Sequence, residues 1–62
     1  MPMTPEEDQI VNLEGFGPGT VIGVYEGNEF PVHVLFVTGK AETFTVELFN
    51  QLLINYSGEF QP

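Results

Sequence analysis

Five glycines and one proline lie between residues 15 and 27, in the stretch GFGPGTVIGVYEG, the first pattern that could carry chemistry. Glycine-rich loops can hold phosphate with their backbone amides, but a Walker-type loop ends in Gly-Lys followed by Ser or Thr and leads into a helix. Here the glycines lead into Thr-Val-Ile, a β-type sequence, without a lysine. A dinucleotide-binding fingerprint also needs a helix after its glycines. The stretch therefore predicts a tight corner between two strands, not a phosphate site.

Side chains able to act in catalysis or metal binding are few in this chain. His33 is the only histidine and there is no cysteine, so a catalytic triad would have to combine His33 with unrelated hydroxyl groups. A histidine between two valines is typical of a sheet surface. Glu6, Glu7 and Asp8 are consecutive, whereas a calcium loop spaces its oxygen ligands around a central glycine. We predict a protein without enzyme activity, metal site or cofactor.

The charge balance is the most unusual property of the sequence. Nine acidic residues oppose the single cation Lys40, which gives a formal net charge of −8. Phosphate affinity comes largely from Lys and Arg, so we expect no direct binding to nucleic acid or to an anionic membrane. Two interpretations of the acids remain open: they keep a small protein in solution, or they form a surface complementary to a basic partner.

Membrane and export signals are also missing from the sequence. The longest apolar run is too short to cross a bilayer, and the first residues lack the basic and apolar segments of a signal peptide. We therefore expect a cytoplasmic protein.

Turn signals divide the chain into one small domain with two polar ends. Sixty-two residues allow a single domain with a small core. Thr4, Pro5 and Glu7 fit the start of a single helical turn over residues 5–8. The predicted units are residues 1–9, a polar and acidic lead-in; residues 10–56, the folded domain; and residues 57–62, a C-terminal tail.

Short β-type segments, separated by glycine-rich turns, fill the predicted domain. Gly15 to Gly19 are expected to make the first turn, and Gly23 a bulge or sharp bend in the second strand. Leu48 and Leu52 are expected to face the core from a short helical turn, with Phe49 as a further candidate. The expected strands cover residues 10–13, 20–26, 30–37, 41–46 and 54–56, with the helical turn at 47–53. This pattern predicts an all-β fold: a small five-stranded SH3-like (Tudor-like) barrel with one short helical turn before the last strand.

The order of these segments resembles a known family. VNLEGFGPGTVIGVYEG, then VHVLF, GK and FNQLLI, is similar to the Tudor-like barrel at the carboxyl end of DNA-repair helicases of the UvrD/PcrA type, over about Val11 to Ile54. The matching positions are Phe16, Gly17, Gly19, Thr20 and Val21 at the first corner, and Val32, Val34 and Phe36 in the central strand. In that family the module docks on other proteins, notably RNA polymerase. The strong acidity departs from this pattern, and similar small barrels also occur among bacteriophage proteins.

Apolar residues in the central strand point to a binding surface. In VHVLFV both faces are apolar except at His33, whereas a half-exposed strand alternates. Leu35 and Val37 therefore belong either to a covered core face or to an interface, and both interpretations remain open. The predicted partner-binding residues are Tyr25, Glu26, Glu29, Phe30, Leu35, Val37 and Tyr56.

Together these features predict a non-enzymatic protein-interaction module. We expect it to dock through an acidic and aromatic surface on a protein partner with a basic or mixed surface, or on a nucleic-acid-processing enzyme. The alternative is an acidic inhibitor, of phage origin, whose carboxylates imitate nucleic acid and occupy the basic groove of a host enzyme.

Overall fold

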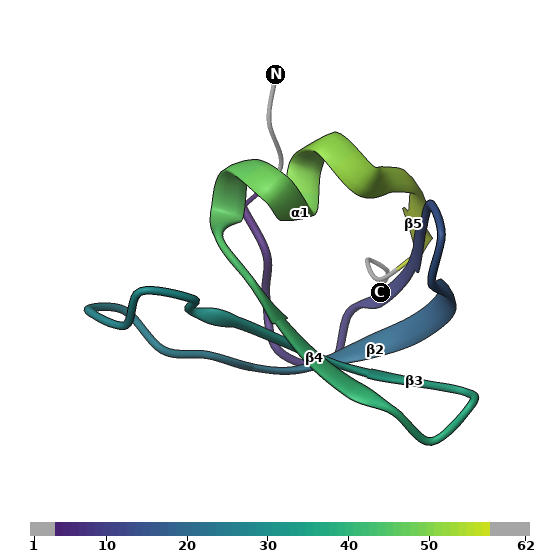
Figure 1. Cartoon of the computed structure of the whole chain (residues 1–62), viewed down its shortest axis with the longest axis horizontal. Helices are drawn as coiled ribbons and strands as arrows, with labels where there is room; N and C mark the ends of the chain where they lie inside the picture. Colours follow the sequence, from purple (N-terminus) through teal and green to yellow (C-terminus); the bar gives the residue numbers. More distant parts are fainter. Residues whose placement is uncertain (1–3, 58–62) are drawn as a thin grey trace.

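A computed structural model describes residues 4–57 of the chain (Figure 1). Five strands and one helix follow one another as β1 (Ile10–Leu13), β2 (Gly17–Val24), β3 (Val32–Phe36), β4 (Ala41–Phe44), α1 (Val46–Leu52) and β5 (Leu53–Ser57). Residues 1–3 of the predicted lead-in and 58–62 of the predicted tail lie outside this part. Ser57, placed in the tail by the sequence, is the last residue of β5.

All five strands belong to one antiparallel sheet, in the order β4-β3-β2-β1-β5. This confirms a mostly β fold with five strands and one short helix. Within residues 4–57 no strand pairing joins the edges β4 and β5, so the sheet is open. Helix α1 connects these two edges directly and arches over one side of the curved sheet (Figure 1).

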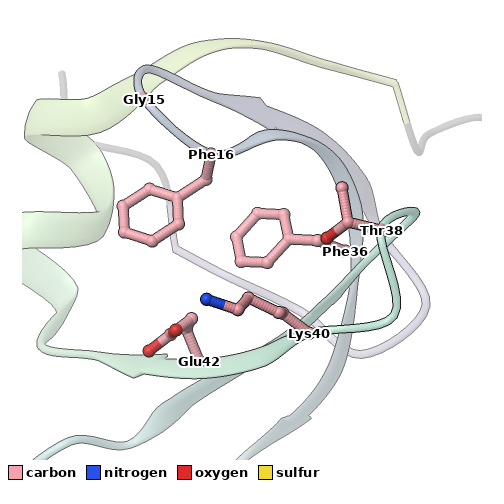
Figure 2. A pocket seen from close by; sticks show the side chains of 6 residues that line it. All are labelled: Gly15, Phe16, Phe36, Thr38, Lys40 and Glu42. Carbon is pink, nitrogen blue, oxygen red and sulfur yellow. The ribbon is translucent and has the colours of Figure 1, made fainter.

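The first hairpin shows why the sequence carries so many glycines here. The Phe16 amide donates to the carbonyl of Leu13 (3.0 Å), and Gly15 takes the positive φ (84°) that the turn requires. The turn therefore ends before Gly17, and the prediction that Gly17 to Gly19 belong to it was wrong, because these residues pair with β1 as the start of β2. Phe16 then points toward Phe36 of β3 (Figure 2).

Gly19 serves close packing between β2 and β3. A Cβ at this position would lie 2.8 Å from the Cδ1 of Phe36 and 3.0 Å from the Leu35 carbonyl oxygen. Real Cβ atoms essentially never approach another atom within 3.0 Å, so a side chain here would require the Phe36 ring to shift at the point where Gly19 pairs with Phe36.

The lead-in contains a turn, not the predicted helical turn. The Gln9 amide donates to the carbonyl of Glu6 (3.3 Å), the Glu6 amide donates to Oε1 of Gln9, and Asp8 has a φ of 73°. The reason is competition for backbone partners. The Asp8 amide donates to the Val21 carbonyl (2.7 Å), and the Val21 amide donates to the Gln9 carbonyl (2.9 Å), so this segment continues β1 along β2.

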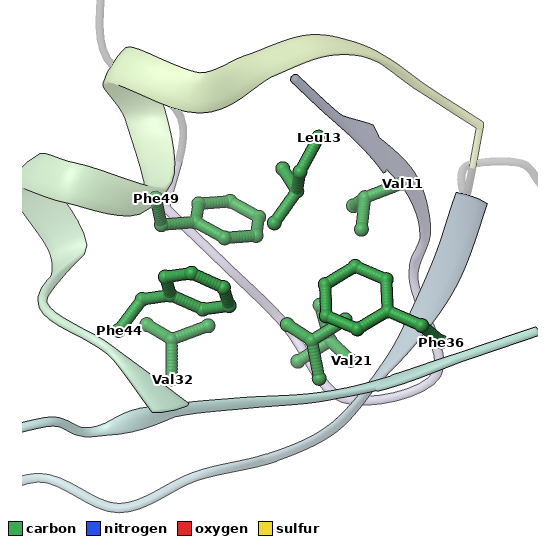
Figure 3. Close-up of a cluster of buried hydrophobic side chains, with 8 residues drawn as sticks. Val11, Leu13, Val21, Val32, Phe36, Phe44 and Phe49 are labelled. Carbon is green, nitrogen blue, oxygen red and sulfur yellow. The ribbon is translucent and has the colours of Figure 1, made fainter. Parts of the chain in front are cut away.

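The core lies between the sheet and α1 (Figure 3). Its buried members are Val11, Leu13, Val21, Val32, Val34, Phe36, Phe44 and Phe49, and Val24, Leu52 and Leu53 pack against it. Thr45 begins α1 as its N-cap, accepting a hydrogen bond from the Leu48 amide at 3.0 Å. Phe49 is the buried residue of the helix, whereas Leu48 is 40% exposed. The prediction that Leu48 faces the core was wrong, because Phe49 occupies that direction, whereas Phe49 and Leu52 were placed correctly.

A bulge interrupts the pairing of β2 with β3, as the glycine at position 23 predicted. The register shifts between Val21, opposite Val34, and Gly23, opposite His33. One extra residue in β2 therefore places Gly23 beside His33, on the face away from the core. This shift decides which residues of the following hairpin share a surface with His33.

Candidate functional site

The side of the sheet away from the core is uncovered within the described residues. Because opposite residues of paired strands share a face, Ile10, Thr20, Leu35 and Ala41 form one row across β1 to β4. Side chains alternate between the two faces of the sheet along each strand. Ile10, Thr20 and Leu35 are each next to a buried core residue in their strand, so they face away from the core. Ala41 pairs with Leu35 and therefore shares its face. We call this side of the sheet the outer face.

A second row of the outer face lies one pleat away. Asn12 pairs with Pro18, and the Val37 amide donates to the Pro18 carbonyl (3.1 Å). Val37 is 75% exposed and Leu35 44% exposed, so neither is core. The question that the sequence left open is thereby decided: no described element covers Leu35 or Val37, and both belong to a free surface.

The third row of the outer face contains His33. Gly23, His33 and Thr43 lie opposite one another on β2, β3 and β4. The ring of Tyr25 lies against the imidazole of His33, with ring centroids 4.6 Å apart. His33 is half-buried on a sheet surface, as its place between two valines predicted.

Charge is distributed away from these rows. Exposed acids lie in the hairpin that follows β2 (Glu26 and Glu29) and in the segment before β1 (Glu6, Glu7 and Asp8). Glu42 pairs with the buried Val34 and therefore lies on the opposite side of the sheet. None of the positions in the three rows carries an Asp, Glu, Lys or Arg residue. The outer face is an uncharged, partly apolar surface on a chain of net charge −8.

The hairpin between β2 and β3, residues 25–31, projects from one end of the sheet (Figure 1). Its ends are joined by the Tyr25 amide, which donates to the Pro31 carbonyl at 2.9 Å. The Asn28 amide donates to the Tyr25 carbonyl (3.2 Å), and Gly27 has the positive φ (92°) of a type II turn. We call residues 25–31 the Tyr25 hairpin.

The predicted partner-binding residues fall into three groups. Tyr25, Leu35 and Val37 are brought together on the outer face, and Glu26, Glu29 and Phe30 are exposed in the Tyr25 hairpin beside it. Tyr56 lies elsewhere, on the edge strand β5 opposite Val11. Sequence reasoning missed Ile10 and Pro18. The alternation of Ile10 with buried Val11 was a usable signal, whereas the place of Pro18 beside Val37 depends on the fold.

A shallow pocket of about 470 Å³ opens between the first turn and the β3–β4 turn (Figure 2). Phe16 stacks on Phe36 at a centroid distance of 5.2 Å and meets Phe44 edge-on at 5.3 Å. Lys40 and Glu42 supply one charge of each sign, and the lining is completed by Gly15 and Thr38. This surface suits a small apolar group, and it contains none of the predicted partner-binding residues.

Residues 4–57 contain neither a membrane-spanning helix nor a cluster of metal ligands. No helix among them is long and apolar enough to cross a membrane. Residues 4–57 hold no group of three or more His, Asp or Glu side chains arranged for a metal ion. Comparisons of the chain with protein-family models, curated proteins and solved structures find no match. The proposals below therefore depend on the geometry of the chain itself.

Proposed function

We propose that this protein is a non-enzymatic docking module that binds a partner protein through its outer face. The single observation that supports this is the combination of exposed Leu35 and Val37 with a surface free of fixed charge, on a chain that carries nine acids. A chain that used its acids only for solubility would have no reason to leave one side of its sheet uncharged. Contiguous apolar surface on a small protein marks an interaction site.

We also propose that the open sheet belongs to the SH3-like barrels. The support is the chain order: four strands pair successively, a short helix follows, and the last strand returns beside the first. We likewise propose that the chain shares the fold of the helicase-associated barrels. It agrees with a docking function, because in that family the module binds other proteins.

The negative charge of the chain indicates what kind of surface the partner has. Exposed carboxylates adjoin the outer face in the Tyr25 hairpin, so a partner with an apolar centre and basic residues at that rim is complementary. An acidic surface repels nucleic acid, so the partner is a protein. Apolar contact at Leu35 and Val37 supplies affinity, and the charges at the rim supply the rate and selectivity of association.

The test is capture from a lysate of the source cell, or of its host if the source is a virus, with two matched variants. Leu35→Glu places a carboxylate on the outer face, and Leu48→Glu places one at a residue of similar exposure on α1. We expect Leu35→Glu to reduce the amount of bound partner by about tenfold or more, and Leu48→Glu to leave it unchanged. Equal retention by both variants would contradict docking through the outer face.

The acidic mimic of nucleic acid predicts a different pattern in the same experiment. Capture would then be released by added DNA or by raised salt, and it would be insensitive to Leu35→Glu, because carboxylates at the turns make the contact. The docking module predicts a partner that high salt weakens only modestly, since apolar contacts are not screened.

A further inference from the structure

The ring of Tyr25 packs on the outer face against two residues of neighbouring strands. Its ring covers Gly23, where a Cβ would lie 2.5 Å from the tyrosine hydroxyl oxygen and 2.6 Å from the ring carbons Cε2 and Cζ. The ring also packs against the imidazole of His33, with a centroid distance of 4.6 Å and an angle of 58° between the planes. Tyr25 still remains 49% exposed. One side of the ring therefore rests on Gly23 and His33, and the exposed remainder is available to a partner.

Two glutamates of the same hairpin have no cationic partner within the described residues. Glu26 and Glu29 are exposed in the Tyr25 hairpin, and neither forms an ion pair within residues 4–57. The only cation of the chain, Lys40, lies beyond the far end of β3, near the opposite turn (Figure 1). The Tyr25 end of the outer face is therefore negative and aromatic, whereas the Leu35 and Val37 end is apolar.

We propose that the Tyr25 hairpin receives an arginine side chain of the partner protein, stacked on the Tyr25 ring and paired with Glu26 or Glu29. The inference rests on the proposed docking function and names the chemistry of its partner: a segment in which an arginine adjoins apolar residues that cover Leu35 and Val37. Guanidinium groups stack on aromatic faces and pair with carboxylates at the same time, which the compact, strongly hydrated ammonium of lysine does less well.

The open geometry favours an unmodified arginine. A single ring on a sheet surface, backed by Gly23 and His33, offers one flat side and leaves the other to solvent. Methylated cations lose hydrogen-bond donors and need several rings around them, whereas an unmodified guanidinium keeps its donors for the carboxylates.

The experiment is an NMR titration of the ¹⁵N-labelled protein with acetyl-Gly-Arg-Gly-amide and with the same peptide carrying citrulline or lysine. Citrulline keeps the shape of arginine and removes its charge. We expect the arginine peptide to shift the amide signals of Gly23, Tyr25, Glu26 and His33. Its affinity should exceed that of the citrulline peptide by about five- to thirtyfold, with lysine between the two.

Variants distinguish the contribution of the Tyr25 ring to arginine binding from that of the two carboxylates. Tyr25→Leu keeps an apolar side chain and should reduce the arginine preference, and Gly23→Ala should do the same by displacing a tyrosine that is still present. Glu26→Gln with Glu29→Gln should weaken binding by about threefold or more, whereas Glu7→Gln with Glu47→Gln, which has the same net charge, should not.

Three outcomes would overturn the arginine site: equal binding of the citrulline peptide, equal loss in both pairs of glutamate variants, or shifts spread over all acidic segments. None of these three outcomes depends on Leu35. If partner capture depends on Leu35 but the peptides show no arginine preference, the docking function stands and the arginine site is wrong. If capture does not depend on Leu35, the docking function itself is wrong.

Discussion

Adjacent residues of β3 should respond in opposite ways to the same substitution. Val34 is fully buried and Leu35 is 44% exposed, although they are neighbours in one strand. We predict that Leu35→Glu leaves the protein folded and that Val34→Glu unfolds it. The two variants share strand, new side chain and net charge, so a difference between them reports the face of the sheet and nothing else.

The magnitudes follow from burial. Fully burying a leucine side chain contributes about 1.5–3 kcal/mol, so the roughly half of Leu35 that is covered contributes about 0.8–1.7 kcal/mol. Stability for a chain of this size is about 3–9 kcal/mol, which exceeds that loss. Val34→Glu removes about 1.5–3 kcal/mol of apolar burial and takes a carboxylate out of water, which costs several kcal/mol more. The sum reaches or exceeds the stability of the whole domain.

Urea unfolding followed by circular dichroism measures both free energies, and a ¹H–¹⁵N spectrum shows whether each variant is folded. We expect a native-like spectrum with a small decrease in midpoint for Leu35→Glu, and a collapsed or unfolded spectrum for Val34→Glu. If Leu35→Glu lost the folded spectrum as Val34→Glu does, Leu35 would be part of a core, and the outer face as defined here would not exist.

Three further substitutions test how the sheet and helix are held. Gly19→Ala should lower the free energy of unfolding by about 1–3 kcal/mol, because the new methyl group meets the Phe36 ring and the Leu35 carbonyl; a neutral result in urea would show that the Phe36 ring can move aside without cost. Thr45→Ala should cost about 1 kcal/mol by removing the cap of α1, and Thr45→Ser should keep most of it; equal loss in both would argue against the cap. Asp8→Gly should raise stability by about 0.5 kcal/mol, as the relief of left-handed strain at φ 73° exceeds the added chain entropy; a decrease in the unfolding midpoint would contradict this.

The turns could be predicted because glycine leaves a local signal. Gly15, Gly27 and Gly39 all take positive φ at hairpin turns, and each lies between β-type segments in the sequence. The limits of β2 could not be predicted in the same way. Gly17 and Gly19 look like turn residues, yet they pair with β1, and Gly19 is needed for contact with a ring seventeen positions away. That contact exists only in the folded sheet.

The prediction of a helical turn before β1 was wrong for a similar reason. Local capping residues favoured it, but two backbone hydrogen bonds with Val21 outcompete a single isolated turn. Tertiary pairing decided the conformation of a segment whose own sequence indicated another.

The sequence predicted some residues of the candidate site and missed others. The double-sided apolar pattern singled out Leu35 and Val37, but only strand register shows that Pro18 lies beside Val37 and that Ile10 shares a row with Leu35. Tyr25 reaches the same face because the bulge at Gly23 shifts the register by one residue. A one-residue shift changes the face of every following side chain, and its position is a property of two strands together.

The most direct test of the central claim is site-specific photocrosslinking in the source cell, or in its infected host. A benzophenone amino acid at position 35 of the outer face is compared with the same group at position 48 on α1. We predict a discrete crosslinked protein adduct from position 35 and none from position 48. Adducts from position 48 alone, or the same adducts from both positions, would contradict docking through the outer face.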